Sequence, residues 1–368
     1  MNAGLGVLGR RLCARYIALM SDLPDGRRFV TPALCGLALA LGSGCPSAAT
    51  PSSSPVPGAA ATAALSPAEL MRVTRRSFAT HAERDYFLYL PAGYANAPEK
   101  LWPVLLFLHG NGERGDAKAD LDYLLKNGPL YEAWIQKRDL PFIIVAPQLP
   151  MYGQDEKAEY LKNRRRDEIP VRLAEGVPAR PPRFATPNPM TGAVAVDLPE
   201  GSTPYGPPMG WPELEADLIG MLDSVLHERR GDPERQYLTG VSYGGFGTWY
   251  LAGKHAERFA AIVPVVGYGH PDSMPAIAAA KLPVWCFAGG RDESVKVKHF
   301  YAGLNRLEAL GGELRFTIEA DLGHDVWSRV YAGNDVYDWL LAHRRTGPVA
   351  AANALSGSPS APLQPTKH

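Results

Sequence analysis

A serine stands between two glycines in the segment Gly240-Val241-Ser242-Tyr243-Gly244, after the β-rich run RQYLT and before a helical pattern. A serine on a sharp strand-to-helix turn projects its hydroxyl from the edge of a sheet, and flanking glycines let neighbouring elements pass close. The positive end of the following helix dipole points at the same place. The spacing therefore predicts a nucleophile at Ser242 rather than a serine that only caps a helix.

A serine nucleophile needs a base, and the sequence offers nine histidines. His324 lies in the segment DLGHD after the last predicted strand. That position is at the carboxyl edge of the sheet, where ligands bind in open α/β folds. His270, after the run IVPVV, is a lesser candidate, and most of the other histidines fall on predicted helices as expected for surface residues. We expect His324 to be the base.

The histidine in turn needs an acid that orients it. Asp292 lies in the segment GGRDE, directly after the apolar run VWCFA and at the same predicted edge. The chain order Ser242, Asp292, His324 is one of the known orders of a catalytic triad. Glu293 is the neighbouring alternative, and Asp272 after the preceding strand is a more distant one.

Attack on a carbonyl carbon leaves a negative oxygen that hydrogen-bond donors must stabilise. One expected donor is the backbone N–H of Tyr243, the residue after the nucleophile. The other is expected from the glycine-rich loop HGNGERG at residues 109–115, which follows the run PVLLFL. Glycines let this backbone approach a substrate closely. The N–H of Asn111 is favoured there, with that of Gly112 next.

Four nearby side chains each have two interpretations. Glu113 and Arg114 could form an ion pair that fixes the loop, which is the favoured interpretation, or they could contact substrate. Trp211 and Trp327 flank the predicted site and could form apolar walls for a substrate, although a role in the core fits either residue equally well.

The elements that must hold these residues alternate along the chain. The predicted strands are residues 73–80, 85–90, 103–108, 142–146, 236–239, 262–266, 284–288 and 313–319, and the predicted helices are 212–229, 245–255, 296–310 and 335–343. Most of the strand runs from residue 103 onward are apolar throughout, as strands buried on both faces of a parallel sheet must be, whereas the last alternates like an edge strand. We predict an α/β fold with a mostly parallel, doubly wound sheet behind an early antiparallel pair.

A long segment separates the strand at 142–146 from the next helix. Residues 149–210 carry a charge run at 155–168 and many prolines. Segments of this length without regular structure are usually functional or disordered. We expect an insertion that covers the site as a lid, and a surface excursion without a role is the alternative.

The two ends differ from the middle. Arg27 and Arg28 precede a short apolar run at 29–41 and small residues that end at Cys45, which predicts an export signal over residues 1–45. Residues 46–66 have the composition of a linker, 67–345 form the predicted catalytic domain, and 346–368 a disordered tail. The exported protein would be periplasmic, extracellular or attached to a membrane only through a lipid anchor at Cys45.

The motifs together resemble those of a known superfamily. The segments WPVLLFLHGNGERG, YLTGVSYGGFGTW, RFAAIVP and GHDVW are similar to those of the secreted esterase and peptidase branch of the α/β-hydrolases, over residues 73–345. Neighbouring groups are the dienelactone hydrolases, the phospholipase/carboxylesterase group and polyhydroxybutyrate depolymerase-like esterases. The resemblance implies that Ser242, Asp292 and His324 form the triad and that the loop at Asn111 completes the oxyanion hole.

Composition and resemblance lead to one expected function. The 38 basic and 38 acidic residues give a formal net charge of zero, which argues against a nucleic-acid partner. We expect a serine hydrolase that cleaves small-molecule or polymeric carboxylic esters through an acyl-enzyme, with no metal or organic cofactor. A serine peptidase of the same fold is the alternative, and an inactive binding protein on this fold is a third.

Overall fold

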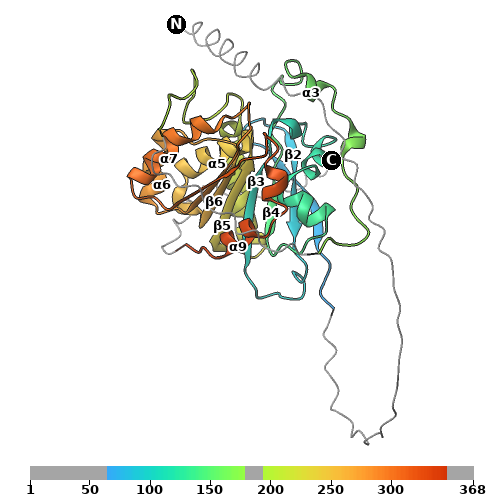
Figure 1. Cartoon of the computed structure of the whole chain (residues 1–368). Coiled ribbons are helices and arrows are strands. Elements are labelled where there is room, and N and C mark those ends of the chain that lie inside the picture. The colour runs from blue at the N-terminus through green and yellow to red at the C-terminus, as the bar shows by residue number, and fades with distance from the viewer. Residues whose placement is uncertain (1–63, 179–193, 346–368) are drawn as a thin grey trace, which may run out of the picture.

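Eight strands form one mixed sheet in the order β1-β2-β4-β3-β5-β6-β7-β8 (Figure 1). The computed structural model describes residues 64–178 and 194–345. Within this part of the chain the strands are β1 (Glu69–Arg76), β2 (Glu83–Leu90), β3 (Trp102–Leu108), β4 (Ile143–Ala146), β5 (Gly231–Val241), β6 (Ala261–Val265), β7 (Val284–Gly289) and β8 (Leu314–Glu319). β2 pairs antiparallel with β1 and with β4, and every pair from β4 to β8 is parallel. The predicted fold class is confirmed.

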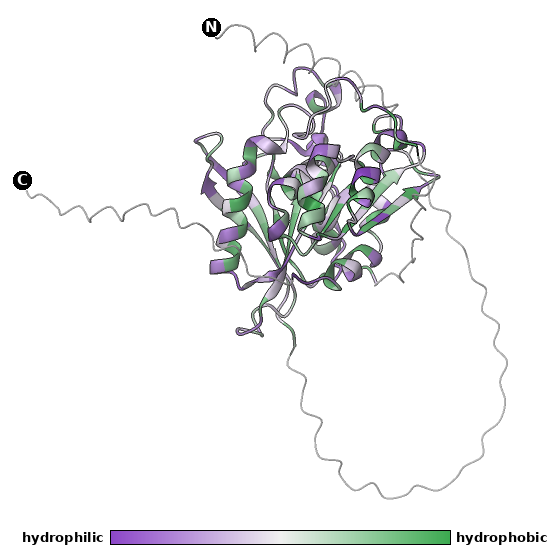
Figure 2. Ribbon diagram, turned by 90° about the vertical axis from the view of Figure 1, so that its left-hand side faces the viewer, coloured by the Kyte–Doolittle hydropathy of each residue, from purple (hydrophilic) through white to green (hydrophobic). Residues whose placement is uncertain are grey.

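Helices cover both faces of the sheet. They are α2 (Gly128–Leu130), α3 (Glu159–Lys162), α4 (Glu215–Glu228), α5 (Tyr243–Lys254), α6 (Met274–Ala279), α7 (Phe300–Ala309), α8 (Trp327–Val330) and α9 (Asp335–Leu341). The core cluster on one face takes residues from α4, α5, α6 and α7, whereas the cluster on the other takes residues from α8, α9 and the segment 121–135. Figure 2 shows apolar residues concentrated in the strands and polar ones on the outer sides of the helices.

The central strand β3 shows why the apolar runs form a sheet buried on both sides. All seven of its residues are buried, and alternate residues belong to opposite clusters: Val104 and Leu106 to one, Leu105 and Phe107 to the other. β8, which alternates in sequence, lies at the edge of the sheet as expected. Cys286 in β7 is buried and free, and burial raises the pKa of its thiol.

Two predicted strands differ from those observed. β1 begins at Glu69 and ends at Arg76, because residues 77–82 form a turn closed by the Ser77 N–H bond to the Ala82 carbonyl and by His81 at a φ of 55°. β5 begins at Gly231, before the predicted residue 236, because Gly231 already pairs with Trp102 of β3, and a register shift precedes the next pair, Gln236 with Val104. A local turn therefore explains the early end of β1, and pairing with a strand distant in sequence explains the early start of β5.

The described parts of the insertion, residues 149–178 and 194–210, pack against the body of the protein. Arg164 lies with its guanidinium carbon 4.0 Å from the centre of the Tyr123 ring and pairs with Asp120 at 2.7 Å. Further along, the Leu173 N–H donates to the Ile135 carbonyl at 3.0 Å. The predicted export signal, the linker as far as residue 63 and the predicted tail lie outside the described residues. No helix within the described residues is both long and apolar enough to span a bilayer.

Candidate active site

Ser242 occupies a strained turn between β5 and α5. Its backbone has a φ of 52° and a ψ of −115°, which is unfavourable for a residue with a Cβ atom. Neighbouring elements hold the turn, because the Ser242 N–H donates to the Val265 carbonyl at 2.9 Å and the Ser242 carbonyl accepts from the Phe246 N–H at 3.0 Å. The side chain is thereby presented at the carboxyl end of the sheet, as expected.

The two glycines of the motif are required by close backbone contacts. A Cβ atom on Gly244 would lie 1.8 Å from the carbonyl oxygen of Leu108 at the end of β3. A Cβ atom on Gly240 would lie 2.3 Å from the carbonyl oxygen of Gly244. Any larger residue at either position would force β5, α5 and β3 apart.

The structure brings the three predicted catalytic side chains together. His324 Nε2 lies 2.9 Å from Ser242 Oγ, and His324 Nδ1 lies 2.7 Å from Asp292 Oδ2. The other carboxylate oxygen, Asp292 Oδ1, accepts the backbone N–H groups of Ser294 and Val295, each at 2.8 Å. The Asp292 side chain is fully buried, and that of His324 is 11% exposed. A base is thus in contact with the nucleophile and is oriented by a fixed carboxylate.

The alternative acids lie elsewhere. Glu293 is exposed and pairs with Lys296 at 3.0 Å. Asp272 is also exposed, and its carboxylate lies 3.5 Å from Nδ1 of His270. Among the described acidic side chains, Asp292 is therefore the one that bonds to His324, and it is also the acid favoured from the sequence.

The glycine-rich loop lies against the nucleophile. A Cβ atom on Gly110 would lie 3.6 Å from the Ser242 Cβ, and residues Asn111–Glu113 form a single 3-10 turn. The Glu113 side chain lies against the start of this turn, because a Cβ atom on Gly110 would lie 3.3 Å from Glu113 Oε2. The first N–H groups of a helical turn have no partner within the turn. Asn111 and Gly112, the predicted donors, are the first two residues of this turn.

Tyr243 is placed by the same rule. It is the first residue of α5, so its N–H lies at the positive end of the helix dipole. Its position directly after Ser242 puts this donor beside the atom that would attack a carbonyl. Both predicted oxyanion donors therefore belong to segments that adjoin Ser242.

Glu113 and Arg114 each fix a different part of the loop. Burial raises the pKa of Glu113, and its Oε1 accepts a hydrogen bond from Asn127 Nδ2 at 2.7 Å. The Arg114 guanidinium is fully buried and donates to Asn111 Oδ1 at 2.5 Å, to the Pro150 carbonyl at 2.8 Å and to the Met209 carbonyl at 2.9 Å. Both side chains hold the loop, each through bonds to other residues rather than through the expected ion pair with one another.

The two tryptophans have different surroundings. Trp211 is 1% exposed and belongs to the core, where its Nε1 donates to the His109 carbonyl at 3.3 Å. The expectation that Trp211 lines a substrate site is therefore corrected, because the side chain has almost no surface to offer. Trp327 is half-buried, and its ring stands perpendicular to that of His324 with 5.4 Å between centroids. Trp327 thus flanks the predicted base.

His109 has a structural role in the same loop. Its Nε2 accepts the Leu149 N–H at 2.8 Å, so the neutral ring carries its proton on Nδ1, which faces the Gly110 carbonyl at 2.5 Å. Complete burial lowers the pKa of His109 to about 3.

Three polar residues that hold the site were not predicted. The Gln148 amide bonds to Glu113, Asp120 and Ala117, with the Glu113 carbonyl accepting from Nε2 at 2.8 Å. Asn127 bonds to Glu113, and the Tyr160 hydroxyl of the insertion accepts from Asn111 Nδ2 at 2.5 Å. Only Gln148 had a signal in the sequence, because it directly follows a predicted strand.

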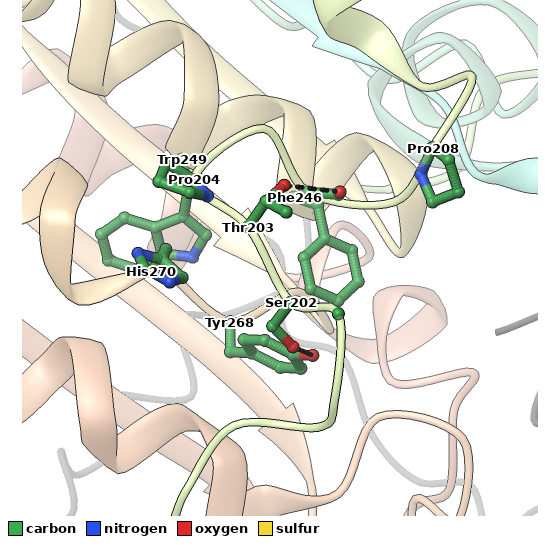
Figure 3. A pocket seen from close by; sticks show the side chains of 10 residues that line it. Ser202, Thr203, Pro204, Pro208, Phe246, Trp249, Tyr268 and His270 are labelled. Atoms are coloured by element: carbon green, nitrogen blue, oxygen red, sulfur yellow. Dashed lines mark hydrogen bonds between the residues drawn. The ribbon is translucent and has the colours of Figure 1, made fainter. Parts of the chain in front are cut away.

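A pocket lies beside the first turn of α5 (Figure 3). Its walls include Phe246 and Tyr268, whose rings are perpendicular with centroids 4.8 Å apart, together with residues 201–204 of the insertion. The Tyr268 hydroxyl lies 3.2 Å from the Ser202 hydroxyl. Phe246 bonds through its N–H to Ser242, so the pocket begins one helical turn from the nucleophile. No cluster of side chains suited to a metal ion occurs in residues 64–178 and 194–345.

Comparisons with known proteins concern the fold and one segment. The model of the prolyl oligopeptidase family matches residues 214–277, which contain Ser242 but neither Asp292 nor His324. The crystal structure of a thermostable esterase is similar, with 22% identity and a TM-score of 0.51 over 75% of this chain and 63% of that one. This chain therefore spans less than two thirds of the length of that esterase. The similarity shows the fold of the chain.

Two other solved structures are more distant. A fluorophosphonate-binding serine hydrolase from Staphylococcus aureus has 12% identity and a TM-score of 0.47, covering 75% of this chain and 98% of that one. An acylaminoacyl peptidase from Pyrococcus horikoshii has 15% identity and a TM-score of 0.44, covering 76% of this chain and 41% of that one. No curated protein sequence matches the chain significantly.

Proposed function

On this α/β-hydrolase fold, we propose a serine hydrolase that cleaves carboxylic esters through an acyl-enzyme intermediate. The observation that carries the proposal is the pair of hydrogen bonds that His324 makes, one to Ser242 Oγ at 2.9 Å and one to Asp292 Oδ2 at 2.7 Å. Such a chain of nucleophile, base and oriented acid is the arrangement that makes a serine hydroxyl reactive.

The geometry supports the following steps. His324 Nε2 takes the proton of Ser242 Oγ as the oxygen attacks the ester carbonyl carbon. The oxygen that becomes negative lies toward the N–H groups of Tyr243 and Asn111. His324 then gives its proton to the departing alcohol, which leaves an acyl group on Ser242. Water activated by the same imidazole releases the acid, and Asp292 holds the ring in one tautomer throughout.

A serine peptidase is the second candidate, because the prolyl oligopeptidase family model matches the segment around the nucleophile. The two candidates share every step except the identity of the leaving group. Turnover of p-nitrophenyl esters of increasing acyl length, measured beside a panel of aminoacyl p-nitroanilides, separates them. Ester turnover with no amide turnover is the expected result, and preferential amide cleavage would contradict the ester assignment.

We also propose that the insertion shapes access to the site. Tyr160 contacts Asn111 of the expected oxyanion hole, and Ser202 contacts Tyr268 at the pocket beside α5, so described residues from both halves of the insertion meet the site. Replacing residues 152–207 by a short Gly/Ser connector would then change the ratio of kcat/KM between small and bulky esters. An unchanged ratio would refute a lid.

Export is proposed from the amino-terminal pattern of two arginines, an apolar run and small residues. The mature chain would begin at or shortly after Cys45, either free or carrying a lipid on that cysteine. Mass spectrometry of the protein from the exported fraction tests this, because an intact segment 27–41 would refute processing and an added diacylglyceryl mass would identify an anchor.

A further inference from the structure

A path of side-chain contacts joins the oxyanion loop to the histidine of the triad. Asn127 Nδ2 donates to Glu113 Oε1 at 2.7 Å, and Asn127 Oδ1 accepts from Trp327 Nε1 at 3.1 Å. The Trp327 ring then stands at 89° to the His324 ring, with centroids 5.4 Å apart. Both ends of one amide are therefore used, each by a loop that carries a different part of the catalytic machinery.

The first end of this path controls the oxyanion loop. The Glu113 carboxylate that receives the Asn127 amide lies beside Gly110, where an added Cβ atom would be 3.3 Å from Glu113 Oε2 and 3.6 Å from the Ser242 Cβ. Moving the carboxylate would disturb Gly110 and the start of the turn that contains the predicted donors. The position of Glu113 thus bears directly on the predicted donor at Asn111.

The second end controls the base. Trp327 is the first residue of α8 and lies three residues after His324, so its indole packs against the imidazole from the same loop. The indole is tied down by its Nε1–H bond to Asn127. Without that bond the ring could turn about its side-chain torsions, and the face against which His324 packs would no longer be fixed.

The backbone next to Asn127 is tightly packed. It directly precedes Gly128, which has a φ of 78° and is packed so closely that a Cβ atom there would lie 2.2 Å from Cζ of Phe107. Phe107 belongs to β3, the strand that leads into the oxyanion loop. The Asn127 amide and the oxyanion loop to which it is bonded are therefore both positioned by β3.

We infer that Asn127 is a positioning residue that sets the placement of the oxyanion donors relative to His324. The inference rests on the proposed acyl-transfer function, in which proton transfer at His324 and charge development at the oxyanion occur in one transition state. Errors of about 1 Å between such groups cost about a hundredfold in rate. One amide bonded to both loops is a direct means of limiting that error.

Two variants interrupt the path of contacts from Glu113 to His324 at different points. Asn127→Leu keeps a similar volume and removes both hydrogen bonds, whereas Trp327→Phe keeps an aromatic ring beside His324 and removes only the Nε1–H donor. We expect each variant to lower kcat for p-nitrophenyl esters by about tenfold to a hundredfold, with KM changed much less. Because both substitutions break the same path, the double variant should be no slower than Asn127→Leu alone.

A matched control isolates positioning from stability. Gln136 donates its side-chain amide to the Tyr131 hydroxyl at 2.6 Å, a partly buried hydrogen bond of the same kind outside the described site. Gln136→Leu should lower Tm, because it removes one such hydrogen bond, while leaving kcat unchanged. Should Asn127→Leu fail to fold, Trp327→Phe still tests the path, because it removes a single hydrogen bond from a half-buried residue.

The possible results separate the inference from the function on which it rests. Normal kcat in folded Asn127→Leu and Trp327→Phe would overturn the inference alone, and so would independent losses that multiply in the double variant. A folded wild-type protein that cleaves neither esters nor amides and does not react with a fluorophosphonate would overturn the proposed function, and the inference with it.

Discussion

The guanidinium carbon of Arg114 lies 4.9 Å from the centre of the Tyr243 ring. The same guanidinium donates to the carbonyl oxygens of Pro150 and Met209, which stand at the two ends of the insertion. One buried side chain thus joins the residue after the nucleophile to both ends of the insertion. The two ends of the insertion are therefore held in a fixed position relative to the turn that carries Ser242.

Removing Arg114 should destabilise the protein strongly. Arg114→Met leaves the carbonyls of Pro150 and Met209 without this donor, and each buried acceptor left without a partner costs about 1 to 3 kcal/mol. We expect the free energy of unfolding to fall by about 2 to 5 kcal/mol in urea titrations. Arg165→Met is the matched control, since Arg165 pairs with Asp167 and both side chains are mostly exposed. Equal, small losses in the two variants would contradict the role given to Arg114.

The motif-bearing part of the fold could be predicted from the sequence because local patterns specify it. The apolar run at 103–108 gives β3 and the glycines around Ser242 give the turn, within a residue or two of the observed boundaries. Asp292 and His324 could be selected because each follows a strand of a parallel sheet, and the carboxyl ends of such strands meet at one edge.

The support for the site could not be predicted, because it depends on contacts between distant residues. Asn127 and Trp327 are 200 positions apart, and nothing in the local sequence of either indicates the bond between them. Trp211 follows the insertion directly, so its place in the core depends on how that insertion returns to the sheet. Arg114 was recognised as part of the loop, but its two carbonyl partners lie in a segment without periodicity.

Replacing the acid of the triad should lower the rate while leaving the fold intact. Asp292→Asn preserves the side-chain shape but favours the imidazole tautomer that cannot accept the proton of Ser242, a change that costs about 10⁴-fold in kcat in a serine protease. We expect a loss of about 10³-fold to 10⁴-fold in ester turnover. Asp272→Asn is the control, since Asp272 is exposed and lies beside His270. Activity that survives the first change but not the second would mean that Asp272 is the acid.

Stability should fall in acid through His109. The unfolded histidine has a pKa near 6.5, whereas burial lowers the pKa of the folded residue to about 3. Between these two pKa values the unfolded state binds a proton that the folded state does not. The free energy of unfolding therefore increases with pH in this window, and it decreases progressively as the pH falls from about 6.5 toward 3.

The variant His109→Gln isolates this contribution. Its side-chain oxygen can still accept the Leu149 N–H, and it does not titrate. Glu113, whose pKa is raised by burial, contributes with the opposite sign in both proteins. Urea titrations between about pH 7 and pH 4 should therefore show a steeper loss of stability on acidification in the wild type than in the variant. Parallel curves would show that folding does not lower the pKa of His109.

The central claim is that Ser242 is a nucleophile activated by His324, and covalent labelling tests it most directly. Incubation with a fluorophosphonate, followed by intact mass measurement and peptide mapping, should show one phosphonyl group per chain on Ser242. Ser242→Ala should not be labelled and His324→Ala should be labelled far more slowly, while both keep the wild-type Tm within a few degrees. Labelling of Ser242→Ala at the wild-type rate, or no labelling of folded wild-type protein, would contradict the account.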